Sequence, residues 1–207
     1  MTDDGEGRPA DPGPTSPDDD EGARRTDRAL MAAVAEGDRV AFRVLLRRYW
    51  APLVAYSAEF VLDRDVGQDV VQRTFIQVWK TRDRWTPSST VNAYLYRITR
   101  NLSLNARRDR TLRQERHEGW GRAENRTAGV RTPDQHLEID FLRREVQGAL
   151  DQLSERRREV FVLSRFHGLT HREIAEARGT SPQTVSNQLS AALKELRATL
   201  SHLLDEL

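Results

Sequence analysis

The sequence predicts an all-α protein made of two small helical domains joined by a flexible linker. Apolar residues recur at helical spacing over two blocks, residues 26–113 and 137–204, and no stretch shows the alternation of a β-strand. Between them, residues 114–136 form a polar segment with three glycines and Pro133, which is typical of a linker. The chain has 207 residues, 31% of them charged, which suits small helical domains better than one large globule.

Composition excludes several classes of site. The chain has no cysteine, which excludes disulfides and thiolate metal sites and fits a reducing cytoplasm, where we expect the protein to act. No apolar run is long enough for a membrane helix, and the N-terminus lacks the basic start and apolar core of a signal peptide. Residues 1–25 hold eight acidic residues, three arginines and four prolines, and are predicted to form a disordered acidic tail.

The first block reads as four helices. A break at Gly37 separates the first from the second, and the loop of residues 83–90 contains Pro87 and precedes the fourth. Apolar stripes at helical spacing define each helix. The helices are expected within residues 26–65, divided at Gly37, and over residues 65–82 and 91–110.

The fourth of these helices is strongly basic. Between Tyr94 and Arg116 the chain carries seven arginines and two acidic residues, although the net charge of the whole chain is only +1. The acidic tail masks this segregation in the total. A local charge of +5 indicates an anionic partner, and the neighbouring Trp85, Tyr94 and Tyr96 offer surfaces on which unpaired bases could stack.

The second block ends in a predicted helix-turn-helix. After helices over residues 137–153 and 154–169, Thr170 and Glu173 form a capping box that begins a short helix. Gly179 is suited to end that helix, and Ser181 followed by proline is suited to begin the next. This short turn between two capped helices predicts a DNA-binding unit rather than an ordinary helical hairpin.

The second helix of this unit is almost uncharged. It offers amide and hydroxyl side chains, which can read base edges in the major groove, and its first lysine is Lys194. Basic residues at its flanks would supply phosphate contacts. The predicted DNA contacts of this block are Arg158, His171, Arg172, Ser181, Gln183, Thr184, Ser186, Asn187, Ser190 and Lys194.

Two long segments carry a family resemblance. "DVVQRTFIQVWKTRDRW" followed by "AYLYRITRNLSLNARR" resembles region 2 of bacterial RNA polymerase sigma factors of the extracytoplasmic-function class. "LDQLSERRREVFVLSRFHGLTHREIAEARGTSPQTVSNQLSAALKELR" resembles region 4 of the same class. Their order, the linker and the chain length agree with that class. The resemblance implies that the blocks are region 2 (residues 26–113) and region 4 (residues 137–204).

The resemblance also implies partners and roles. Core RNA polymerase, through its largest and second-largest subunits, promoter DNA and a possible cognate anti-sigma factor would be the partners, with no cofactor, metal or catalytic residue. Region 4 would bind the minus-thirty-five element. The polymerase-binding residues would be Asp69, Gln72, Arg73, Phe75, Ile76 and Trp79. The minus-ten element would be read by Arg84, Trp85, Tyr94, Tyr96, Arg97, Arg100, Asn101, Asn105, Arg107 and Arg108.

Other interpretations stay open. Phe75, Trp79 and the two tyrosines also fit positions in a helical core. A helix-turn-helix regulator that acts without polymerase, or a helical interaction protein that binds no DNA, would share much of this pattern. The acidic tail is a further hypothesis: it would screen the basic surface of region 2 and weaken non-specific DNA binding.

Overall fold

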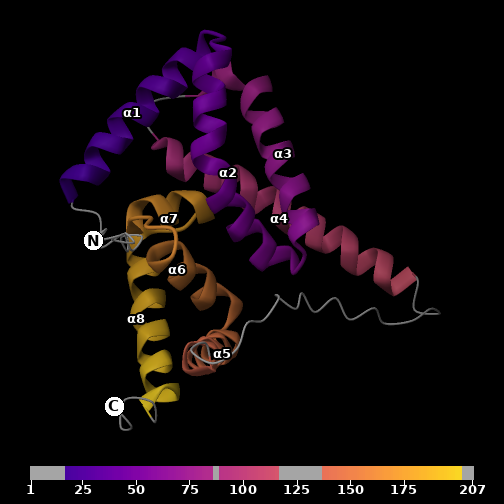
Figure 1. The fold of residues 1–207 in the computed structure, drawn as a ribbon, viewed down its shortest axis with the longest axis vertical. Helices are drawn as coiled ribbons and strands as arrows, with labels where there is room; N and C mark the ends of the chain where they lie inside the picture. The colour runs from indigo at the N-terminus through magenta and orange to yellow at the C-terminus, as the bar shows by residue number, and fades with distance from the viewer. Residues whose placement is uncertain (1–16, 86–88, 117–136, 202–207) are drawn as a thin grey trace, which may run out of the picture.

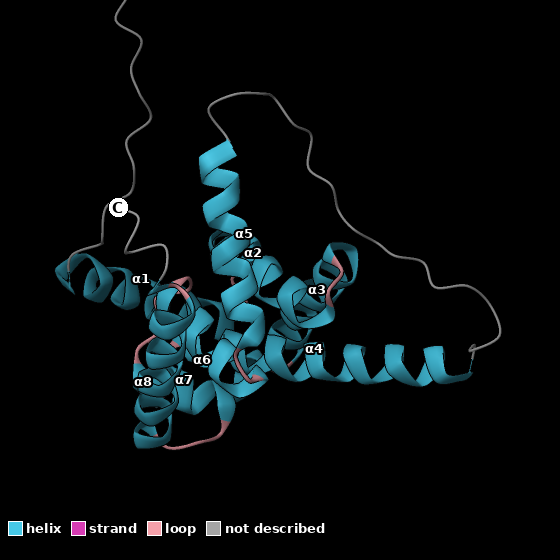
Figure 2. Cartoon of the chain, turned by 90° about the horizontal axis from the view of Figure 1, so that it is seen from below, coloured by secondary structure: helices cyan, strands magenta, loops and turns pink. Residues whose placement is uncertain are grey.

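The computed structural model describes residues 17–85, 89–116 and 137–201, and within these residues every element of regular structure is helical (Figure 2). The predicted all-α fold class is therefore confirmed. The elements are α1 (Pro17–Ala35), α2 (Arg39–Val61), α3 (Arg64–Lys80), η1 (Arg82–Arg84), α4 (Val91–Arg116), α5 (Leu137–Gln152), α6 (Glu155–Arg165), α7 (His171–Arg178) and α8 (Pro182–Thr199).

Two helices extend beyond their predicted limits. Residues 1–25 were predicted to be a disordered tail, but α1 begins at Pro17. A proline followed by acidic residues favours the start of a helix, because proline fits the first position and acids suit the helix dipole. Helix α4 runs to Arg116, into the segment predicted as a linker. The remaining parts of both segments, residues 1–16 and 117–136, lie outside the described residues.

The first block is a bundle of α1 to α4. Side chains of all four helices share one buried cluster, in which Tyr56, Phe75 and Leu95 are among the largest members. Polar groups inside this bundle are paired across helices: Ser57 and Ser103 lie 2.9 Å apart between their hydroxyls, and Thr74 and Thr99 lie 3.2 Å apart. Pairing avoids the cost of leaving a buried hydroxyl unsatisfied.

The caps predicted for the helix-turn-helix are all present. The side chain of Thr170 accepts from the backbone N–H of Glu173, whose carboxylate accepts in return from the N–H of Thr170. Gly179 ends α7 in the left-handed conformation with φ of 66°. Ser181 Oγ accepts from the N–H of Thr184 and begins α8. Local sequence therefore determines this unit.

The two blocks share a single hydrophobic core. Buried residues of α6 to α8, including Leu163, Ile174 and Val185, belong to the same cluster as the core of α1 to α4. Figure 1 shows α6 and α7 directly beneath α2 and α4, with α5 and most of α8 farther away. A smaller cluster joins α5 to α8 through Ala149, Leu153 and other residues. In this structure the second block is thus docked on the first.

Helices α2 and α3 approach closely at Gly67. A Cβ atom at Gly67 would lie 3.1 Å from the backbone nitrogen of Ala58, which cannot move without shifting α2. We expect Gly67→Ala to lower the free energy of unfolding by about 1–3 kcal/mol, as overpacking does.

Urea denaturation checks this value, with Gly148→Ala in α5 as the matched control. A Cβ at Gly148 would meet no atom within 4 Å, so this variant should gain about 0.5–1 kcal/mol from helix propensity. If both variants gained free energy of unfolding equally, α2 and α3 would be able to move apart at Gly67 without a measurable cost.

Candidate nucleic-acid interface

The outer face of α8 presents the predicted base-reading residues. Gln183, Asn187, Ser190 and Lys194 are exposed. Gln183 Nε2 donates to Asn187 Oδ1 over 2.9 Å, so the two amides form one pair on the surface. Neighbouring Ser186 is partly exposed. These amides retain further donors and acceptors toward solvent, which is what recognition of base edges requires.

Other predicted contacts of region 4 serve different local roles. Ser181 and Thr184 form the cap of α8, and their hydroxyls lie 2.8 Å apart. Arg158 in α6 forms an ion pair of 2.6 Å with Asp151. His171 and Arg172 are exposed at the start of α7, where they are available to phosphates.

Helix α4 carries an exposed polar stripe. Arg97, Asn101, Asn105 and Arg108 are spaced three or four residues apart, so they share one face of the helix, and all four are exposed. The guanidinium of Arg97 lies 5.7 Å from the ring centre of the half-buried Tyr94. The α4 stripe combines two cations and two amides along a straight helix, a surface suited to a nucleic-acid backbone and its bases.

Three other predicted minus-ten residues face region 4 instead. Tyr96 is buried, and its hydroxyl is hydrogen-bonded to His167 Nδ1 over 2.9 Å. Arg100 Nε donates to Glu159 over 2.6 Å, and Arg107 forms two hydrogen bonds to Glu155. The hydrogen bonds from Arg107 lower the pKa of Glu155. In this arrangement Tyr96 is buried and the two guanidiniums are paired with carboxylates of the second block, although the Arg107 side chain is still 45% exposed. Contact of these three residues with DNA stays a prediction.

Glu159 is the centre of the contact between the blocks. Its carboxylate, with 4% of the side chain exposed, also accepts from the hydroxyl of Tyr56 over 3.1 Å and lies 2.9 Å from Nε of Arg178 in α7. Burial raises the pKa of Tyr56 well above its usual value, so its hydroxyl stays a donor. One carboxylate thus connects α2, α4, α6 and α7.

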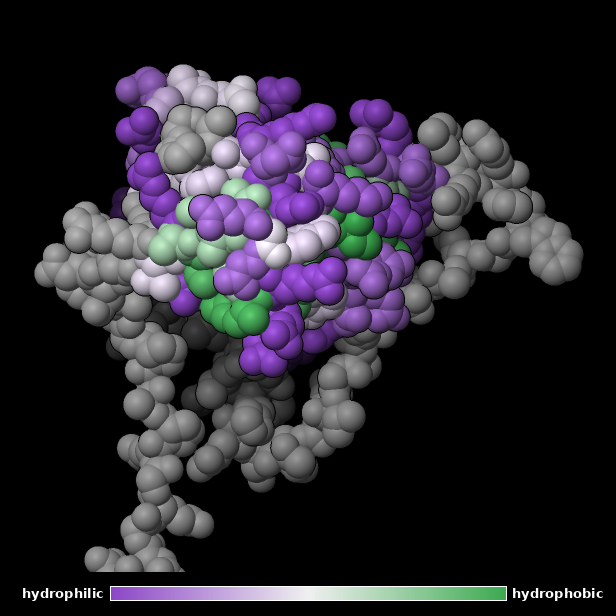
Figure 3. All heavy atoms as spheres, turned by 90° about the horizontal axis from the view of Figure 1, so that it is seen from above, coloured by the Kyte–Doolittle hydropathy of each residue, from purple (hydrophilic) through white to green (hydrophobic). Residues whose placement is uncertain are grey.

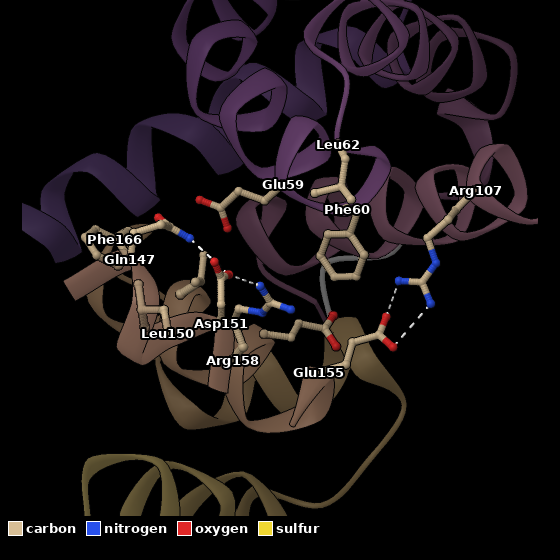
Figure 4. A pocket seen from close by; sticks show the side chains of 12 residues that line it. Glu59, Phe60, Leu62, Arg107, Gln147, Leu150, Asp151, Glu155, Arg158 and Phe166 are labelled. Atoms are coloured by element: carbon tan, nitrogen blue, oxygen red, sulfur yellow. Dashed lines mark hydrogen bonds and ion pairs between the residues drawn. The ribbon is translucent and has the colours of Figure 1, made fainter. Parts of the chain in front are cut away.

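A groove of ≈ 430 Å³ opens beside this contact (Figure 4). Phe60 and Leu62 reach into it from the end of α2, and Leu150 and Phe166 line it from region 4. Charged pairs of α4, α5 and α6 form its rim. No local sequence pattern predicts this groove, because residues from both blocks create it.

The segment between α3 and α4 is partly described. Arg84 is exposed at the end of η1, whereas Trp85 is half-buried and packs against the core. Residues 86–88 of the predicted loop lie outside the described residues. Trp85 therefore offers only part of its ring to a stacked base.

The predicted polymerase-binding helix α3 has a well-defined outer face. Asp69, Gln72, Arg73 and Ile76 are exposed and follow the spacing of one helix face; Ile76 is 48% exposed. Phe75 is 2% exposed, so its prediction as a binding residue is corrected: it fills the core.

Trp79 lies at the edge of this face. It packs on Phe42, with ring centres 5.0 Å apart, and borders a shallow hollow with Arg39 and Arg43. Val40 and Val44 of α2 are exposed as well, a feature that sequence periodicity did not single out. Figure 3, which looks onto the end where α1 passes into α2, shows apolar surface among polar residues.

Half-buried His167 is expected to make the contact between the blocks sensitive to pH. Burial lowers the pKa of His167 from 6.5 to about 4. The His167 ring contacts the rings of Tyr56 and Tyr96. Once exposed, this histidine binds a proton near pH 6.5. The unfolded chain therefore takes up a proton that the docked form does not, and stability should fall as the pH drops from about 6.5 toward 4.

Urea denaturation at about pH 7.5 and about pH 5.5 measures this loss. His167→Gln removes the titrating ring and should flatten the difference between the two pH values. An unchanged pH dependence in that variant would assign the effect to other groups.

Neither a metal centre nor a membrane helix is found in the described part of the chain. No group of three or more potential metal ligands gathers among those residues, and none of their helices is long and apolar enough to cross a membrane.

Two family models match the chain, one in each block. They are Sigma-70 region 2 over residues 45–113 and Sigma-70, region 4 over residues 143–196. The RNA polymerase sigma factor NccH of Alcaligenes xylosoxydans xylosoxydans is 31% identical over 179 residues, which cover 84% of this chain and 94% of NccH. The ECF RNA polymerase sigma-E factor of Haemophilus influenzae is 28% identical over 173 residues, which cover 81% and 91% of the two chains.

Solved structures show the same helical fold. The structure of CnrH in complex with the cytosolic domain of CnrY matches with a TM-score of 0.61 at 29% identity, covering 87% of this chain and 98% of that chain. The sigma factor RpoE of Bartonella quintana, solved with the anti-sigma factor NepR, matches with a TM-score of 0.60 at 22% identity, covering 77% and 96%. This second likeness concerns the fold alone.

Proposed function

The chain belongs to the extracytoplasmic-function class of the sigma-70 family of RNA polymerase sigma factors, and we propose that it brings core polymerase to promoters with two separate elements. One observation carries this proposal: the α4 stripe and the outer face of α8 are two polar, DNA-suited surfaces on two different blocks. A two-part promoter is the target that such a pair of surfaces fits. RNA synthesis itself would belong to the polymerase, in the cytoplasm.

The polymerase contact is proposed for the outer face of α3. Ile76 supplies exposed apolar surface beside Asp69, Gln72 and Arg73, a mixture common at protein interfaces. The neighbouring Trp79 and its hollow would extend this contact toward α2. Region 4 would meet the second-largest subunit, and promoter DNA would then bridge both blocks.

Promoter binding is proposed to require separation of the blocks. The α4 stripe is exposed already, but Tyr96, Arg100 and Arg107 contact region 4 in this structure. When these three residues are released from region 4, the tyrosine ring and the two guanidiniums would join the minus-ten surface. Melted DNA is bound by such aromatic rings and cations. CnrH and RpoE were solved with CnrY and NepR, and a protein of that kind is a proposed partner of this chain as well.

Transcription in vitro with core polymerase and a library of genomic promoters tests the proposal. Initiation from promoters that share two spaced elements is the expected result. Tight binding to duplex DNA without any initiation would favour a regulator that acts without polymerase. Absence of both binding and initiation would favour a helical interaction protein.

Asn187 provides a test of region 4. We expect Asn187→Ala to reduce initiation about tenfold at promoters that depend on the minus-thirty-five element, because a base-specific hydrogen bond contributes about 1–3 kcal/mol. Binding to core polymerase should stay unchanged. Gln152→Ala, which removes an exposed amide at the end of α5, is the control. If Asn187→Ala weakened promoter selectivity and polymerase binding equally, α8 would not be the helix that reads the minus-thirty-five element.

A further inference from the structure

Gln188, which directly follows the exposed Asn187 on α8, accepts a side-chain hydrogen bond from a cation. Nη1 of Arg178 donates to its Oε1 over 2.6 Å. Gln188 remains partly exposed, whereas Arg178 is 7% exposed and lies beneath it, at the end of α7. Nε of the same guanidinium lies 2.9 Å from Oε2 of the buried Glu159. Arg178 is therefore fixed between a buried carboxylate and the amide of Gln188.

This contact determines which way the amide faces. A guanidinium has only donors, so the atom of Gln188 that faces Arg178 must be the oxygen. The amide group is planar, which turns its nitrogen away from Arg178. The two N–H donors of Gln188 Nε2 thus point away from Arg178 and stay available, while Arg178 occupies one acceptor position of Oε1.

The fixed amide has a consequence for base recognition. In the major groove guanine presents two acceptors, N7 and O6, and thymine presents O4, whereas cytosine presents only an N–H donor. A glutamine that is free to rotate can also pair with adenine through both its oxygen and its nitrogen. A glutamine held by its oxygen favours bases with an acceptor.

We propose that Arg178 is a positioning residue for the minus-thirty-five element: it holds Gln188 so that Nε2 selects a base with a major-groove acceptor and discriminates against cytosine. The inference rests on the proposed function of region 4. Arg178, Glu159 and Gln188 all belong to region 4, so the arrangement persists when the two blocks separate. The same contact places the Arg178 cation behind α8, whose first turns carry no basic residue.

The experiment is transcription in vitro with core polymerase, the full chain and promoters randomised over the minus-thirty-five element. The wild-type chain should show one position at which cytosine is used about tenfold less than guanine or thymine. Gln188→Ala should remove that preference. Arg178→Lys, which keeps the charge but loses the planar fork, should reduce it to a similar degree, and the double variant should show no further loss.

Controls separate positioning from a merely structural role. Arg197→Lys, the same change at an exposed position of α8, should leave the base preference intact. If Arg178→Lys lowers initiation equally at all sequences and keeps the preference, Arg178 is structural and the inference is overturned. Wild-type chain that does not initiate with core polymerase overturns the proposed function instead, which is a distinct result.

Discussion

Glu159→Gln is expected to lower the free energy of unfolding by about 3–5 kcal/mol. The carboxylate of Glu159 lies between Arg100 and Arg178 and is almost completely buried. Glutamine keeps the shape but removes the negative charge, and its amide nitrogen cannot accept from either guanidinium. Arg178, itself buried, would then lack an ionic partner, which costs far more than the loss of an exposed pair.

Urea denaturation of the full chain measures this change, and small-angle X-ray scattering reports whether the blocks also separate. Glu155→Gln is the matched control, because it removes the same charge from an ion pair whose carboxylate side chain is 52% exposed. That variant should lose about 1 kcal/mol or less. Similar losses for the two variants would show that burial gives Glu159 no special role.

Phe75→Ala should also destabilise the chain by about 3–5 kcal/mol, because it leaves a cavity in the core of region 2. Phe75 packs edge-on against Phe42 with ring centres 5.9 Å apart. The neighbouring Ile76 lies on the outer face of α3 and is half exposed. Ile76→Ala should therefore change stability by about 0.5 kcal/mol or less and still weaken polymerase binding.

Paired measurements of unfolding and of affinity for core polymerase distinguish the two roles. Loss of affinity in Ile76→Ala with normal stability supports α3 as the polymerase contact. Normal affinity in Ile76→Ala would move that contact elsewhere, and a fully stable Phe75→Ala chain would contradict the described core.

The helix-turn-helix could be predicted in detail because its signals are local. Thr170, Glu173, Gly179 and Ser181 each act within four residues along the chain, so their types and spacing were sufficient. The same holds for the α4 stripe, which follows from helical spacing once the helix is identified. Phe75 and Ile76 show the limit: both are apolar neighbours, and only tertiary packing shows which one faces the core.

The contact between the blocks could not be predicted, because its partners are remote in the sequence. Glu159 is 103 residues from Tyr56 and 59 residues from Arg100. In the sequence Glu159 directly follows three arginines, a pattern common to charged residues on a helix surface. Tyr96 and His167 are likewise brought together only by docking. Local patterns place each of these residues in its own block, so they carry no information about the shared contact.

The two carboxylates that hold region 2 against region 4 have a consequence for opening. Glu155 and Glu159 contact Arg107 and Arg100, the same arginines that are proposed to bind the DNA backbone. In the docked form these carboxylates pair with the two guanidiniums, and under the proposed function the phosphates of promoter DNA would replace them. Opening on a promoter would then be an exchange of one anion for another, in which neither arginine has to remain without a counter-charge.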